Sequence, residues 1–163
     1  MQCYSSQFLS QGGAAVDGEH ISLGFLPFED AKSNAQVANF DKYTDTSKRD
    51  GFAADAYGAG LLFRDAVNAV VKASGNNALT RKALFQALNN IHAFTGDGMF
   101  GTTDIAGRVP SDCYMITQVK NGKFQREFPT KAGTLDCSKR NLANFTLDRG
   151  TAIMSATVSA HFR

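Results

Sequence analysis

The pattern of apolar and polar residues predicts a β-strand near the beginning of the chain. Ile21, Leu23 and Phe25 alternate with polar or small residues. This period of two gives a strand one apolar face. Pro27 cannot donate to a strand ladder, and we therefore expect the strand to span residues 19–26.

A second pattern predicts a β-hairpin over residues 113–128. Residues 113–119 are rich in β-forming types, and Asn121-Gly122, the preferred pair for a two-residue type I′ turn, follows them. Beyond the turn, one face of the return strand carries Phe124, Arg126 and Phe128. We expect the two strands to pair directly.

Between these strands, a period of three to four residues predicts a long helix over residues 52–73. Its apolar positions are Phe52, Ala56, Ala59, Phe63, Val67 and Val70. Gly75 follows as a C-terminal cap. Because the helix is rich in small residues, we expect it to pack closely on a sheet.

Shorter helices are predicted on both sides of the long one. Residues 4–11 form the end of a helix that Gly12-Gly13 breaks, and a short helix is expected over residues 34–43. Thr80 is a suitable N-cap for a helix over residues 80–91. Its apolar face carries Leu84, Ala87, Leu88 and Ile91.

Composition places the chain among globular proteins. Its 163 residues are 43% hydrophobic and 20% charged, which suits one ordinary domain. No apolar run approaches the ~20 residues of a membrane helix. The first ten residues, MQCYSSQFLS, lack the charged and apolar regions of a signal peptide.

The net charge of +2 conceals an asymmetry. Residues 1–119 hold nine Lys/Arg and twelve Asp/Glu, a net of −3, whereas residues 120–163 hold eight and three, a net of +5. The basic side chains of the second part have neither aromatic interleaving nor a basic helix. We therefore expect a solvated face and exclude nucleic acid; the cations around the hairpin are Lys120, Lys123, Arg126, Lys131, Lys139 and Arg140.

The three cysteines, Cys3, Cys113 and Cys137, have no metal-ligand spacing. In an extracytoplasmic compartment Cys113 and Cys137 can form a disulfide, with Cα atoms about 4.4–6.8 Å apart. Two unconnected thiols are an equal alternative. The histidines show no spacing that would make a cysteine catalytic.

No motif predicts an enzyme, a metal site or a cofactor. Gly96–Gly101 matches the spacing G-x-G-x-x-G, but the dinucleotide motif needs a strand before it and a helix after it. A helix precedes it here, so we interpret it as a tight turn. Asp97 and Asp104 could pair as carboxylates, but both lie in this glycine-rich loop and are typical turn formers.

Three segments together resemble a known family. They read GFAADAYGAGLLFRDAVNAVVKASGNNALTRKALFQALNNI, then FTGDGMFGTTDIAGR, then CYMITQVKNGKFQREFPT followed by GTLDC. They are similar to the back half of the branched-chain type amino-acid-binding proteins of ABC transporters. The resemblance implies a type I periplasmic-binding fold, a three-layer α/β architecture of Rossmann-like lobes, of which only the back half is present.

The resemblance also implies a division of the chain. Residues 1–140 correspond to a partial domain, and residues 141–163 are an unassigned tail. Within the domain, residues 1–26 approach the hinge, 27–110 return into the first lobe, and 111–140 form the closing hairpin and crossing.

The function implied is the binding of an amino acid or similar small solute, in the periplasm or at the cell surface, for ABC-transporter membrane subunits. Relatives place an aromatic residue against the ligand at the position of Phe52, for which core packing is the alternative, and a polar contact near Tyr4. Because a front half would supply most of the polar contacts, we expect binding no tighter than millimolar and self-association of the fragment. The alternative is a non-binding remnant or protein-interaction module with the same fold.

Overall fold

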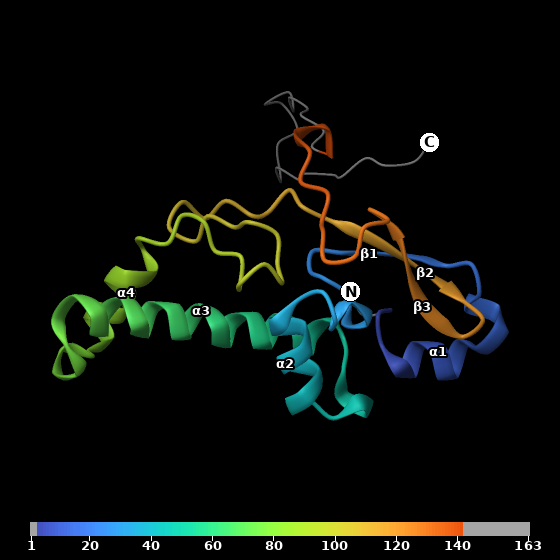
Figure 1. Cartoon of the computed structure of the whole chain (residues 1–163), viewed down its shortest axis with the longest axis horizontal. Helices are drawn as coiled ribbons and strands as arrows, with labels where there is room; N and C mark the ends of the chain where they lie inside the picture. The colour runs from blue at the N-terminus through green and yellow to red at the C-terminus, as the bar shows by residue number, and fades with distance from the viewer. Residues whose placement is uncertain (1–2, 142–163) are drawn as a thin grey trace, which may run out of the picture.

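A three-stranded antiparallel sheet joins the two predicted strand regions (Figure 1). The computed structural model describes residues 3–141. The strands are β1 (His20–Leu23), β2 (Met115–Lys120) and β3 (Lys123–Phe128), in the order β1-β2-β3. The predicted α/β class is confirmed: helices and a small antiparallel sheet form a mixed structure that is consistent with part of a periplasmic-binding fold. The predicted tail lies almost entirely outside the described residues.

The hairpin between β2 and β3 has the predicted turn. Asn121 and Gly122 have φ angles of 53° and 70°, and a type I′ turn requires positive values at both positions. On the other side of β2, Leu23 of β1 faces Met115. Both side chains are buried, so the apolar face predicted for the first strand faces the core.

The return strand departs from the predicted alternation at Phe128. Thr117 pairs with Arg126, whereas the preceding Ile116 pairs with Phe128, so that Glu127 is the extra residue of a β-bulge. A bulge shifts the side-chain alternation by one position. Phe128 is consequently exposed instead of sharing the inner face with Phe124 and Arg126.

Side-chain caps begin each α-helix at or near its predicted start. Ser5, Asn34, Asp50 and Thr80 each accept a hydrogen bond from a backbone N–H of the first turn. The helices are α1 (Ser6–Gly12), α2 (Ala35–Tyr43), α3 (Gly51–Ser74) and α4 (Arg81–Leu88). The 3₁₀ turns are η1 (Gly13–Val16), η2 (Phe28–Asp30), η3 (Thr46–Lys48), η4 (Asn76–Ala78) and η5 (Lys139–Asn141).

Helix α3 buries only part of the predicted apolar face, which includes Val70. Phe52 and Phe63, assigned to its apolar stripe, are 56% and 58% exposed. The buried face carries smaller residues such as Ala54 and Gly58. The Phe100 ring lies so close to Gly58 that an added Cβ would stand 2.6 Å from its Cζ. A side chain larger than glycine at position 58 would therefore clash with this ring.

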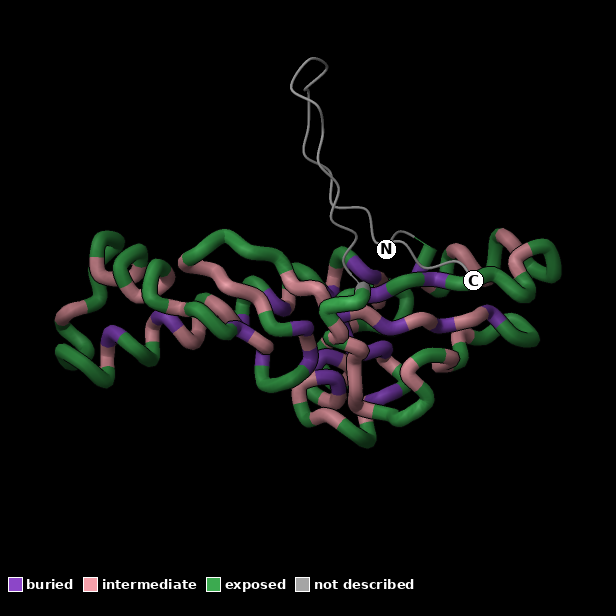
Figure 2. Tube along the Cα trace, turned by 90° about the horizontal axis from the view of Figure 1, so that it is seen from above, coloured by how far each residue is buried: buried purple, intermediate pink, exposed green. Residues whose placement is uncertain are grey.

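The packing on a sheet that the sequence predicts for the long helix is not found: the main contacts of α3 are with α4 and η4 and not with a strand, and α3 reaches the core only through its first turns. Ala53, Ala54 and Tyr57 contact the core, and the rest of α3 projects away from the sheet with α4 packed against it (Figure 1). Figure 2 shows the same division, since the far end of these helices is mostly exposed. The core cluster consists of Tyr4, Ile21, Leu23, Phe25, Leu26, Val37, Phe40, Ala54, Met99, Met115 and Val119.

Arg126 does not belong to the solvated basic face expected from the sequence. Its side chain is 9% exposed and forms an ion pair with Asp30, which is 5% exposed. Arg126 Nη1 also donates to the carbonyls of Pro129 and Thr134, at 2.8 and 2.9 Å. The Gly133 N–H donates to Asp30 Oδ2 at 2.8 Å. This network links η2 to β3 and to the segment that follows it.

Cys113 and Cys137 lie side by side. The backbones of Tyr114 and Asp136 form an antiparallel bridge with two hydrogen bonds of 3.0 and 2.8 Å. The two sulfurs stand 2.06 Å apart, and the Cα atoms are 4.0 Å apart, slightly closer than the expected range. Cys3 is exposed and is not paired within the described residues.

We predict that Arg126→Met lowers the free energy of unfolding by about 3–5 kcal/mol, because it leaves the Asp30 carboxylate buried without a cation to balance its charge. Urea unfolding measures the change. Lys123→Met, on the exposed part of the same strand, is the control and should stay within about 0.5 kcal/mol of the unmodified chain. Equal effects of the two substitutions would contradict the role given to the ion pair.

We predict opposite effects of alanine at two glycines of α3. Gly60 is exposed with no atom near its would-be Cβ, so Gly60→Ala should stabilise the chain by about 1 kcal/mol through helix propensity. Gly58→Ala must displace the Phe100 ring and should destabilise it by roughly 1–3 kcal/mol. Thermal unfolding measures the stability of both variants. If both substitutions stabilised the chain, Phe100 would not pack against α3.

We predict a disulfide between Cys113 and Cys137 in the oxidised protein. Peptide mapping should find both thiols protected from alkylation until reductant is added, whereas Cys3 reacts at once. Reduction should cost about 3 kcal/mol of stability in the loop-entropy model. Two alkylated thiols at positions 113 and 137 before reduction would refute the assignment.

Candidate functional site

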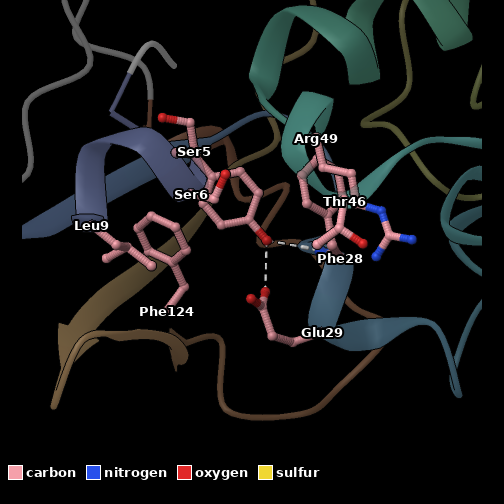
Figure 3. A pocket seen from close by; sticks show the side chains of 9 residues that line it. Ser5, Ser6, Leu9, Phe28, Glu29, Thr46, Arg49 and Phe124 are labelled. Carbon is pink, nitrogen blue, oxygen red and sulfur yellow. Dashed lines mark hydrogen bonds between the residues drawn. The ribbon is translucent and has the colours of Figure 1, made fainter. Parts of the chain in front are cut away.

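A cavity of about 200 Å³ lies between α1, η2, η3 and β3 (Figure 3). These four elements, which come from separate parts of the sequence, meet here around Tyr4. The lining combines aromatic rings, hydroxyl groups, one carboxylate and one guanidinium. It consists of Tyr4, Ser5, Ser6, Leu9, Phe28, Glu29, Thr46, Arg49 and Phe124.

Tyr4 is held at the inner wall of this cavity by two hydrogen bonds. Its hydroxyl accepts from the Phe28 N–H at 2.8 Å and donates to Glu29 Oε2 at 2.6 Å. Figure 3 shows both bonds converging on this oxygen. Tyr4 is only 1% exposed. The hydroxyl therefore orients Glu29 instead of remaining free for a solute.

Aromatic rings form the apolar part of the wall. The Tyr4 ring is tilted against Phe28 and Phe124, with centroids 4.9 and 4.6 Å away. Phe28 in turn stacks on Phe40 of α2 at 4.9 Å. Offset and tilted ring pairs at such distances stabilise one another beyond their buried area. Neighbouring rings thus support the position of Phe28 and Phe124.

Burial shifts the pKa values of Tyr4 and Glu29. Desolvation, and next the charge of Glu29, raise the pKa of Tyr4 well above its usual value, so Tyr4 stays a neutral donor. Glu29 as a residue is exposed, but protein atoms around its carboxylate desolvate that group and raise its pKa. The hydrogen bond from Tyr4 lowers the Glu29 pKa and opposes this shift.

The guanidinium of Arg49 binds residues outside the cavity lining. Its Nη1 pairs with Asp41 Oδ1 at 3.1 Å, and its Nε donates to the Thr44 carbonyl at 3.1 Å. In Figure 3 the guanidinium is turned away from the Tyr4 hydroxyl. Of the two charged groups of the lining, Glu29 faces the Tyr4 hydroxyl and Arg49 holds α2 and η3 together.

The structure brings the neighbourhoods of both predicted ligand residues together. An isolated antiparallel bridge between Ser5 and Asp50 aligns the segment of Tyr4 with the start of α3, where Phe52 lies. Phe52 is exposed, so the core-packing alternative is wrong for it. Sequence reasoning missed Glu29. Its only signal was the acidic pair Glu29-Asp30, which follows Pro27-Phe28.

The glycine-rich segment is the predicted turn. Asp97 has a φ of 54°, and its carboxylate accepts from Arg64 of α3 at 2.9 Å and from Gln36 of α2 at 2.8 Å. Asp104 instead pairs with His92 at 2.9 Å. The two aspartates therefore have separate partners and form no carboxylate pair.

The described part of the chain contains neither a cluster of metal-binding side chains nor a membrane-spanning helix. Within residues 3–141, no three His, Cys, Asp or Glu side chains gather as a metal site would require. None of the helices in this range has the length and hydropathy needed to cross a bilayer.

Comparison with known proteins gives one positive result. The family model described as periplasmic binding protein matches residues 1–123, about three quarters of the chain. Among curated proteins, no match is found. Proteins of the matched family act outside the cytoplasm, bind solutes and are not enzymes. The length of this match establishes that the chain belongs to the periplasmic binding protein family.

Proposed function

We propose that this chain takes part in binding an amino acid or a similar small solute outside the cytoplasm, for delivery to the membrane subunits of an ABC importer. The family match over residues 1–123 is the observation that supports the proposal most strongly. The resemblance of its helix, glycine-turn and hairpin segments to amino-acid-binding proteins supports the choice of solute.

The size and lining of the cavity agree with a small polar solute. Its volume of about 200 Å³ is below the ~300–1,000 Å³ of pockets that enclose a drug-sized ligand. A few polar groups among aromatic walls are typical of small-molecule sites. Phe52, exposed at the start of α3, adds an aromatic surface close to the segment of Tyr4.

Binding by this chain should nevertheless be weak. A micromolar affinity corresponds to about −8 kcal/mol, and each charge-assisted hydrogen bond contributes about 1.5–3 kcal/mol. Arg49 is occupied by Asp41 and Thr44, so the cavity lacks a cation for the solute's carboxylate. We therefore expect dissociation constants in the millimolar range.

A second candidate function is protein interaction without solute binding. It is favoured by the large apolar side chains exposed along the projecting helices. These are Phe52 and Phe63 on α3, Leu79 between the helices, and Phe85 on α4. Such side chains can bind another protein surface or a second copy of the chain.

We predict millimolar binding of amino acids that depends on Phe52. Chemical-shift titration with a panel of amino acids measures the affinity, and Phe52→Ala should weaken it about fivefold, the value of one aromatic contact. Phe85→Ala is the matched control, because Phe85 is equally exposed but lies on α4. It should leave the affinity unchanged.

Two results would each contradict a different part of this proposal: the first its function, and the second the expected weak affinity. The absence of saturable shifts with every amino acid, combined with a molar mass that rises with concentration in light scattering, would favour the interaction module. Micromolar binding would show that tight binding does not require a cation in the cavity to pair with the solute's carboxylate.

A further inference from the structure

We propose that the cavity beside Tyr4 receives the ammonium group of the solute, with the Glu29 carboxylate as its hydrogen-bond acceptor and aromatic rings as its walls. This inference rests on the proposed function and assigns the polarity of the same site. It concerns the end of the solute that the described residues recognise.

The first argument is the state of Glu29. A carboxylate can accept about four hydrogen bonds, and among the described residues the side-chain donor to Glu29 is the Tyr4 hydroxyl. The Tyr4 bond holds Oε2 toward the cavity at 2.6 Å. Since the residue is exposed, a donor from solution can reach the remaining acceptor positions.

The second argument is the aromatic wall. Tyr4, Phe28 and Phe124 line the cavity, and the Tyr4 ring contacts the other two at centroid distances of 4.9 and 4.6 Å. The faces of aromatic rings attract cations that approach within about 6 Å. A carboxylate among several rings therefore favours an organic ammonium over an anion.

The third argument excludes the opposite orientation. The carboxylate end of a solute needs a cation, and Arg49 is the cationic residue of the lining. Its guanidinium is bonded to Asp41 and Thr44 and is turned away from the Tyr4 hydroxyl (Figure 3). A carboxylate placed in the cavity would meet Glu29 without compensation, which is unfavourable.

The hydroxyl groups add to the acceptor set. Ser5 Oγ is occupied as the cap of α1, where it accepts from the Phe8 N–H at 3.1 Å. Ser6 and Thr46 also line the cavity. An ammonium group has three N–H donors, and Glu29 with these two hydroxyls can satisfy them.

The test compares two probes of equal length, butylammonium and butyrate, by chemical-shift titration of the full chain. Butylammonium should give saturable shifts at Tyr4, Phe28 and Phe124, and butyrate should give none. Glu29→Gln keeps an oxygen for the Tyr4 hydroxyl but removes the charge. It should weaken butylammonium binding about tenfold or more, the effect of losing a charge-assisted hydrogen bond.

Two further variants keep the result interpretable. Glu19→Gln removes a carboxylate from an exposed position outside the cavity and should bind butylammonium like the unmodified chain. Tyr4→Phe retains the Glu29 charge but removes the hydrogen bond that orients it, so it should weaken butylammonium binding less than Glu29→Gln does. If Glu29→Gln disturbed folding, its spectrum without ligand would differ throughout, and the comparison of butylammonium with butyrate on the unmodified chain would then decide.

The outcomes separate this inference from the proposed function. Amino acids that bind the unmodified chain and Glu29→Gln equally, with no response to butylammonium, would overturn the ammonium site and leave the function standing. Glu29-dependent binding of butylammonium without competition by amino acids would support the site but refute the amino-acid function. Equal binding of butyrate and butylammonium would also overturn the inference.

Discussion

The ion pair between Asp30 and Arg126 is the contact on which the arrangement of the molecule depends. It joins residues 96 positions apart in the sequence, and both side chains are almost completely buried. Burial of two charges is costly unless further hydrogen bonds satisfy them. The Pro129 and Thr134 carbonyls and the Gly133 N–H supply those bonds. The pair thereby fixes η2 against β3 and the segment beyond it.

The position of the cavity follows from that constraint. Asp30 points inward to Arg126, whereas its neighbour Glu29 faces the cavity and receives the Tyr4 hydroxyl. The 3₁₀ turn η2 therefore carries two carboxylates with different roles. Asp30 stabilises the interior through its ion pair, and Glu29 lies at the surface of the cavity. Tyr4 connects the two roles, because its hydroxyl also accepts from the backbone of Phe28. The separate environments of Glu29 and Asp30 explain how adjacent acidic residues come to serve different purposes.

The projecting helices have a different basis. Helix α3 is anchored by its first turns and by the Phe100 ring that packs against Gly58. Asp97 adds polar links from the glycine-rich turn to Arg64 and Gln36. These contacts hold one side of α3 and leave the larger apolar residues of the other side exposed. Phe52, at the start of α3, is among the side chains left exposed in this way.

Local chemistry in the sequence determined the helices, their caps, the Gly75 terminus and the type I′ hairpin, because neighbouring residues decide periodicity, capping and turn dihedrals. The family was also readable, from motifs in three segments. Tertiary structure alone decided three other matters. The bulge at Glu127 turned Phe128 outward, the Phe100 ring packed against Gly58 of α3, and Asp30 drew Arg126 into the interior. Glu29 became a site residue in the same way. Each of these depends on a partner distant in the sequence, and the spacing of residues along the chain contains no information about such partners.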